Sequence, residues 1–159
     1  MGNRAHVIFT DGEKISPAVY LHWNGGPESI YQFLDELDRR NVRADCEYEA
    51  ARFIAIVCEF FDKDYYGACS VGVSNGPTFK KITPSTISSY DHGDNGVFVV
   101  NRSGEIRVVR RFTCGEEWPP CRVEKERDSA YKHKYAMDNS IRSVFGKKPT
   151  EAEATISSE

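Results

Sequence analysis

Apolar residues alternate with polar ones in two segments near the N-terminus of the chain. Ala5, Val7 and Phe9 share one face of residues 3–10, and residues 15–23 repeat the alternation. Such a period of two predicts half-buried strands. Asp11-Gly12 lies between the segments and is a typical hairpin turn. The sequence therefore predicts an N-terminal β-hairpin.

The next two segments have helical spacing. Residues 27–40 carry apolar residues three and four positions apart, after a turn at Asn24-Gly25-Gly26-Pro27. Residues 50–61 form the most apolar run in the chain, which predicts a helix buried on most of its sides. An N-cap at Asp45 and a polar stretch at about residue 62 set the ends of that second helix.

One cation, Arg52, interrupts the apolar run. A charged side chain is rarely buried without a partner. Arg52 therefore either lies at the helix margin, where it pairs with Glu49 or Glu59, or reaches into a pocket and meets an anion there.

The remaining segments predict three more strands. Residues 68–75 are strand-like, residues 79–92 form a loop with one helical turn, and residues 97–102 and 105–112 form a hairpin. Arg110 ends an otherwise apolar face of the last strand, so it is predicted to point towards the core. The order predicts an α+β fold, with an antiparallel sheet of about five strands (ββααβββ) and two helices on one face.

The length of 159 residues predicts one domain over residues 1–121, followed by a charged, partly helical or disordered extension over residues 122–159. The net charge of -3 argues against direct binding to DNA or RNA. No run is apolar enough to suggest a membrane segment. Five cysteines, an odd number without a CxxC pair or secretory signal, suggest a cytoplasmic protein.

Motifs for catalysis or metal binding are missing from the sequence. It contains neither GxSxG nor HExxH, and its four histidines are scattered. We therefore expect no catalytic residue, no metal and no cofactor. The junction His22-Trp23-Asn24-Gly25-Gly26 does have the parts of an anion site, because glycines admit a ligand and a helix begins there. The alternative is a well-capped turn with a satisfied histidine.

Further residues suit a nucleotide ligand. Arginine forks bind phosphate, and an aromatic face or an Asn amide binds a base. The predicted ligand-binding residues are His22, Trp23, Asn24, Gly25, Arg52, Phe79, Asn95 and Arg110.

Two stretches carry a resemblance to a known family. They are Ile15-Ser16-Pro17-Ala18-Val19-Tyr20-Leu21-His22-Trp23 and Ala50-Ala51-Arg52-Phe53, and over about residues 3–112 the chain resembles the phage-encoded Thoeris anti-defence family. Members of this family are small α+β proteins that sequester cyclic ADP-ribose isomers, and some also hold cyclic oligonucleotides. The resemblance implies a homo-oligomer in the host cell cytoplasm with pockets near subunit interfaces. It also implies His22, Arg52, Phe79 and Asn95 as pocket residues.

Three functions follow as hypotheses. The first is a non-catalytic binding protein for a small phosphorylated nucleotide, acting as a counter-defence sponge. The second is a protein–protein inhibitor or adaptor that uses the charged C-terminal segment. The third is a phosphodiesterase with His22 as general base, which requires a partner within hydrogen-bond reach of the imidazole.

Overall fold

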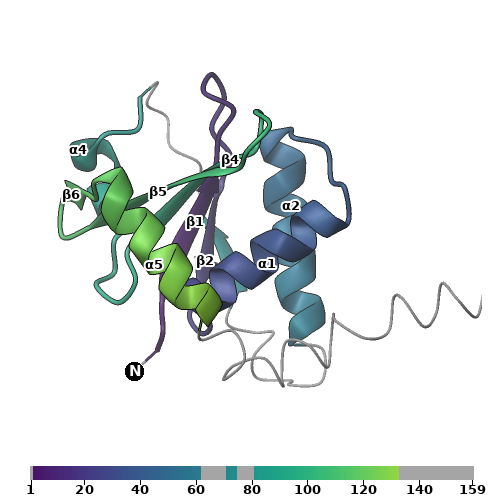
Figure 1. Cartoon of the computed structure of the whole chain (residues 1–159), viewed down its shortest axis with the longest axis horizontal. Helices are drawn as coiled ribbons and strands as arrows, with labels where there is room; N and C mark the ends of the chain where they lie inside the picture. The colour runs from purple at the N-terminus through teal and green to yellow at the C-terminus, as the bar shows by residue number, and fades with distance from the viewer. Residues whose placement is uncertain (1, 62–70, 75–80, 133–159) are drawn as a thin grey trace, which may run out of the picture.

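A six-stranded open sheet runs through the molecule in the order β3-β2-β1-β4-β5-β6 (Figure 1). The computed structural model describes residues 2–61, 71–74 and 81–132. β1 and β4 pair in parallel, and the other neighbouring strands pair antiparallel. The strands are β1 (Ala5–Phe9), β2 (Ala18–Leu21), β3 (Val71–Ser74), β4 (Val97–Asn101), β5 (Val108–Thr113) and β6 (Glu116–Glu117).

The sheet confirms the predicted α+β class but corrects its details. The prediction of about five strands, all antiparallel, was wrong. The two predicted hairpins meet through their first strands, which run parallel, and strand alternation does not encode that choice. The sixth strand, β6, follows a tight turn at Cys114 and Gly115, whose φ values of 54° and 76° suit a two-residue hairpin loop.

Helices cover both faces of the sheet (Figure 1). α1 (Pro27–Arg39), α2 (Cys46–Phe60) and α5 (Pro120–Lys132) pack on one face, so the prediction of two helices there missed α5. The short α4 (Pro84–Ile87) and the 3-10 turn η1 (Ser88–Tyr90) cover the other face. The predicted N-cap of the second helix is confirmed, since the Asp45 side chain accepts from the Glu47 N–H.

The larger of two hydrophobic cores lies between the sheet and the three long helices. Phe53 of α2 is fully buried at its centre, and its ring meets those of Phe9 and Phe33 at 5.6 and 6.0 Å between centroids. The apolar run at residues 50–61 is helical as predicted, but the expectation that it is buried on most of its sides was wrong, since Ala51, Arg52, Ala55 and Glu59 are exposed. The smaller core on the opposite face contains Ile8, Ala18, Ile87, Val97, Val99 and Phe112.

The helix α5 crosses the predicted boundary between residues 121 and 122. Its Val123 and Ala130 are buried, and its Tyr131 hydroxyl donates to Asp35 of α1 over 2.9 Å. Residues 122–132 are thus packed against α1 and β5, and the rest of the predicted extension lies outside the described residues. Among the helices described, none combines the length and apolarity needed to cross a membrane.

Candidate functional site

Three predicted site residues meet around Asn3, just ahead of β1. The Asn3 N–H donates to the His22 carbonyl over 2.8 Å, and the Asn3 carbonyl accepts from the Gly25 N–H over 2.8 Å. The Asn3 side-chain oxygen accepts from the amide of Asn95. We call the group of Asn3, His22, Trp23, Gly25 and Asn95 the Asn3 corner. It joins the end of β2, the start of α1 and the loop before β4.

The imidazole of His22 is hydrogen-bonded at Nδ1 and lies close to Gly2. Nδ1 lies 2.9 Å from the Tyr20 hydroxyl, and a Cβ added at Gly2 would lie 2.9 Å from Nε2. The indole of Trp23 stands edge-on to the imidazole at 5.1 Å between centroids and is 44% exposed. An open aromatic surface therefore adjoins a histidine that is held in one orientation.

The two glycines of the junction have a structural reason in the fold itself. A Cβ at Gly25 would lie 2.5 Å from the Asn3 carbonyl oxygen and 2.8 Å from the Cβ of Ala5. A Cβ at Gly26 would lie 3.0 Å from the Glu28 carboxylate, which also places negative charge in the first turn of α1. The space that we expected to admit a ligand is filled by the N-terminal segment of the chain.

Asn24 is fixed within the same turn. Its φ of 58° lies in the left-handed region, which Asn tolerates better than most residues. Its amide donates to the Ser29 hydroxyl over 3.1 Å. These contacts explain Asn24 as a turn residue at the start of α1.

An ion pair borders the Asn3 corner. Arg4 donates to Asp94 through Nε over 2.9 Å and through its backbone N–H over 3.0 Å. These hydrogen bonds lower the pKa of Asp94 to about 2 and raise the pKa of Arg4. The backbone N–H of Asn95 donates to the Arg4 carbonyl over 3.0 Å. A phosphate approaching this corner would compete with Asp94 for the guanidinium.

The predicted arginines lie elsewhere. Arg52 is on the exposed side of α2, which agrees with the alternative of a helix margin and not with that of a pocket in the core. Arg110 binds Glu117 through two hydrogen bonds of 2.8 and 2.7 Å and donates to the Ile82 carbonyl. Phe79 lies outside the described residues.

Arg111, which the sequence analysis passed over, is the arginine that enters the larger core. Its guanidinium carbon is 3.8 Å from the Phe98 ring centroid and 4.7 Å from that of Trp118. The strand pattern placed Arg111 on the face opposite Arg110, and that face is covered by α5. The signal that could have identified Arg111 is a helix over residues 120–132 whose Glu126 faces β5.

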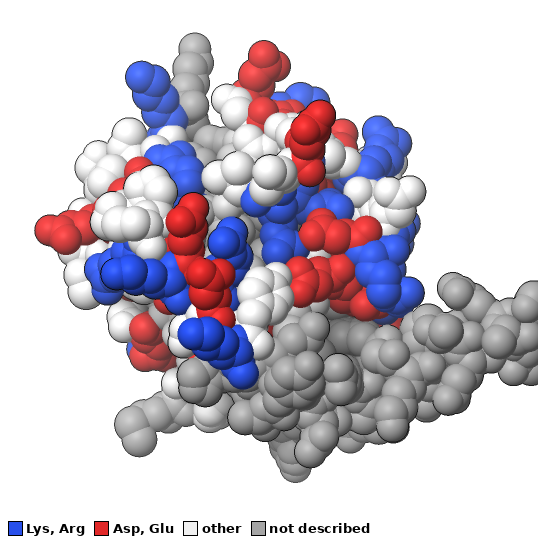
Figure 2. All heavy atoms as spheres, in the orientation of Figure 1, with Lys and Arg blue, Asp and Glu red and all other residues white. Residues whose placement is uncertain are grey.

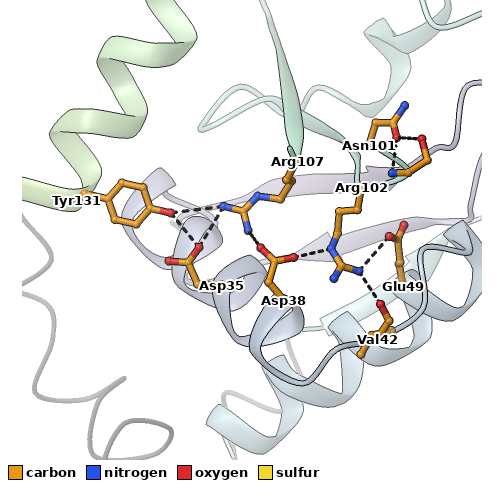
Figure 3. A network of polar contacts seen from close by, with 9 residues as sticks. Asp35, Asp38, Val42, Glu49, Asn101, Arg102, Arg107 and Tyr131 are labelled. Atoms are coloured by element: carbon orange, nitrogen blue, oxygen red, sulfur yellow. Dashed lines mark hydrogen bonds and ion pairs between the residues drawn. The ribbon is translucent and has the colours of Figure 1, made fainter. Parts of the chain in front are cut away.

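The loop between β4 and β5 is tied to α1 and α2 by a polar network (Figure 3). Arg102 donates to Asp38 over 2.6 Å and to the buried Glu49 over 3.0 Å. Arg107 binds Asp38 and Asp35. Burial raises the pKa of Glu49, although Arg102 opposes this shift. Because each cation has its carboxylate, the network holds the loop in place.

A groove of about 610 Å³ follows β5, between the strand and α5. A second cavity of about 350 Å³ lies near the same strand and the β1–β2 turn. Of the predicted site residues, Arg110 lines both. Positive and negative side chains are mixed over the face shown in Figure 2, without a patch of one sign.

Within the described ranges, no three His, Cys, Asp or Glu side chains are placed to hold a metal ion. In comparisons with protein-family models, with curated proteins and with solved structures, no match to this chain was found.

Proposed function

We propose that this protein is a non-catalytic binding protein that sequesters a small phosphorylated nucleotide at the Asn3 corner. The observation that carries the proposal is the triple contact of Asn3, which gathers His22, Gly25 and Asn95 from distant parts of the chain beside an exposed indole. The sequence resemblance suggests a cyclic ADP-ribose isomer or a cyclic oligonucleotide as ligand. The biological role would then be a phage counter-defence sponge in the host cytoplasm.

The side chains of the corner suit the two parts of such a ligand. The open face of Trp23 can stack a base, a contact worth about 1–3 kcal/mol per base. The Asn95 amide NH2 donates to the Asn3 side-chain oxygen and to the Arg4 carbonyl, so a base edge would meet the NH2 of Asn3 and the side-chain oxygen of Asn95. His22 and Arg4 supply donors for phosphate oxygens.

Isothermal titration calorimetry with cyclic ADP-ribose isomers and cyclic dinucleotides tests the proposal. Trp23→Ala should weaken binding at least about fivefold, the loss of one stacking contact. Tyr48→Ala is the matched control, because Tyr48 is equally exposed (46%) but lies on α2. Absence of binding by the wild-type protein at high micromolar ligand would refute the proposal, as would equal losses in the two variants.

Asp94→Asn provides a second test with the opposite sign. It removes the carboxylate that holds Arg4, so the guanidinium becomes available to a phosphate. Affinity for a phosphorylated ligand should rise, and that for the dephosphorylated nucleoside should not. An unchanged phosphate affinity would place the phosphate away from Arg4.

The enzyme hypothesis is tested in the same samples. His22 has a tyrosine hydroxyl at its Nδ1, where many catalytic histidines have a carboxylate. Mass spectrometry of the ligand recovered after incubation distinguishes binding, which returns it intact, from phosphodiester cleavage, which adds one water.

The adaptor hypothesis receives a sharper test from the structure. Deleting all residues after Arg122 would remove Val123, Glu126 and Ala130, which pack against β5 and α1, and so would perturb the fold. Truncation after Lys132 keeps all the described residues of α5, Pro120–Lys132. Loss of a partner interaction on that truncation, with unchanged thermal stability, would favour an adaptor that uses its C-terminal segment.

A further inference from the structure

The outer edge of β5 presents backbone groups that point away from the sheet. The Trp118 N–H donates to the Arg111 carbonyl over 2.9 Å from outside the sheet. On the inner side, the carbonyls of Gly96 and Val100 accept hydrogen bonds from the N–H groups of His6 and Thr10. The alternate residues of β4 therefore direct their backbone N–H and C=O groups towards β5. Because the direction alternates along a strand, Val109 directs its N–H and C=O outwards, as Arg111 does.

This edge is open beside Val109. In the part of the chain that the structure describes, β6 pairs with β5 at Phe112 and Thr113, and Trp118 extends the contact by one hydrogen bond. The chain then turns through Pro119 into α5. The groove of about 610 Å³ lies where the next strand would run, with Trp118 and Val123 in its walls.

Two large apolar side chains stand exposed along the same edge. Ile106 is 77% exposed and Val108 is 55% exposed. Strand alternation places Val108 on the face of β5 that carries Arg110, and Ile106 lies in the bend just before this strand. An open edge with exposed apolar residues is a template for pairing with another strand, and natural proteins usually block such an edge.

We propose that the open edge of β5 pairs antiparallel with β5 of a second copy of this chain, about a two-fold axis at Val108. In this register Val108 faces Val108 of the second copy, and Ile106 faces the aliphatic stem of Arg110. Arg107 and Val109 face each other as hydrogen-bonded pairs, which gives about four backbone hydrogen bonds. The two exposed apolar side chains of each copy become covered.

The charges of the strand favour a second copy as the occupant. Each arginine that enters the interface brings its own carboxylate, since Arg110 binds Glu117 and Arg107 binds Asp35 and Asp38. Pairing of two copies therefore places no unpaired like charges opposite each other. A two-fold axis at Arg107 would instead place two arginines directly opposite each other, which is unfavourable.

Sedimentation equilibrium of the full chain tests this interface. The wild-type protein should be a dimer whose dissociation depends on concentration. Val109→Pro should shift it to a monomer, because the lost N–H points outwards and the β4–β5 ladder is kept. Val109→Ala is the control and should remain dimeric. Circular dichroism and the melting temperature report whether each variant is folded.

A second variant protects the test against a folding failure of the proline variant. Val108→Lys places two ammonium groups together on the two-fold axis and should also give a folded monomer, since Val108 is exposed in the single chain. A wild-type monomer at the highest concentration reached would overturn the proposal, even if another protein binds there. So would a dimer that persists in folded Val108→Lys protein.

Discussion

Arg111 of β5 donates its Nε–H to the Glu126 carboxylate of α5 over 2.7 Å. The arginine side chain is 2% exposed and the carboxylate 15%. Its Nη1 donates to the backbone carbonyls of Asn95 and Val97, and its Nη2 donates to the second carboxylate oxygen of Glu126 over 3.3 Å. One buried cation thus connects the C-terminal helix, the last long strand and the loop that contributes Asn95 to the Asn3 corner.

Glu126→Ala should destabilise the protein strongly, because it leaves the Arg111 charge buried without its carboxylate. The expected loss in the free energy of unfolding is about 3 kcal/mol. Glu126→Gln should cost less, since the amide oxygen still accepts a hydrogen bond. Urea denaturation measures both. Glu124→Ala on the exposed side of the same helix is the control and should stay within about 0.5 kcal/mol. Equal losses at the two positions would refute the buried role of this ion pair.

The connection between β4 and β5 should depend on Arg102 (Figure 3). Arg102→Ala removes the partner of Glu49, whose carboxylate is buried, and should lower the free energy of unfolding by about 3 kcal/mol. Arg43→Ala is the control, because Arg43 is exposed and 3.9 Å from Asp45. Such surface pairs contribute about 0–1 kcal/mol. Faster amide exchange in residues 102–107 would locate the effect, and unchanged exchange there would contradict it.

Much of the fold follows from local pattern. The two hairpins, the two long N-terminal helices and the N-cap at Asp45 were all predicted, because alternation, helical spacing and capping are encoded within about ten residues. The pairing of β1 with β4 was not. It joins His6 to Val97 across some ninety residues, and its strength comes from the shared core and not from either strand alone.

The candidate site was predictable to a similar degree. His22, Gly25 and Asn95 were selected for their chemistry, and the structure brings them together. The organising residue Asn3 was missed, because nothing in its sequence context shows that both its backbone groups bind the next strand and turn. Of the two placements left open for Arg52, geometry favours the helix margin. One charged residue in an apolar helix lies on the exposed side once its neighbour Phe53 takes the buried one.

Gly25→Ala should destabilise the Asn3 corner. The added Cβ meets the Asn3 backbone oxygen at 2.5 Å, and backbone cannot rotate away as a side chain can. We expect a loss of about 1–3 kcal/mol in the free energy of unfolding, as for other overpacked sites. Gly72→Ala on β3 is the matched control, since its new Cβ would have its nearest neighbour, Tyr20 Cδ1, at 3.9 Å. A melting temperature unchanged by Gly25→Ala would show that the N-terminal segment can move aside.

His6 should make stability depend on pH. Its ring lies against Tyr20, Tyr90 and His92, and its Nδ1 is buried with no hydrogen-bond partner among the described residues. Burial, and then repulsion from His92, lower the pKa of His6 from 6.5 to about 4. Below pH 6.5 the unfolded chain therefore takes up a proton that the folded protein resists. The stability that the neutral His6 ring contributes is fully present above pH 6.5. The free energy of unfolding then falls as the pH drops towards 4.

The expected loss over that window is about 3 kcal/mol, from about 1.4 kcal/mol per pH unit. Urea denaturation between pH 4.5 and 7 measures most of it and avoids the titration of Asp94, whose pKa is lowered to about 2. His6→Phe keeps an aromatic ring in the cluster and should flatten the slope. His92→Asn removes the repulsive charge alone and should reduce the slope only in part. A slope that survives in His6→Phe would assign the pH dependence to other groups.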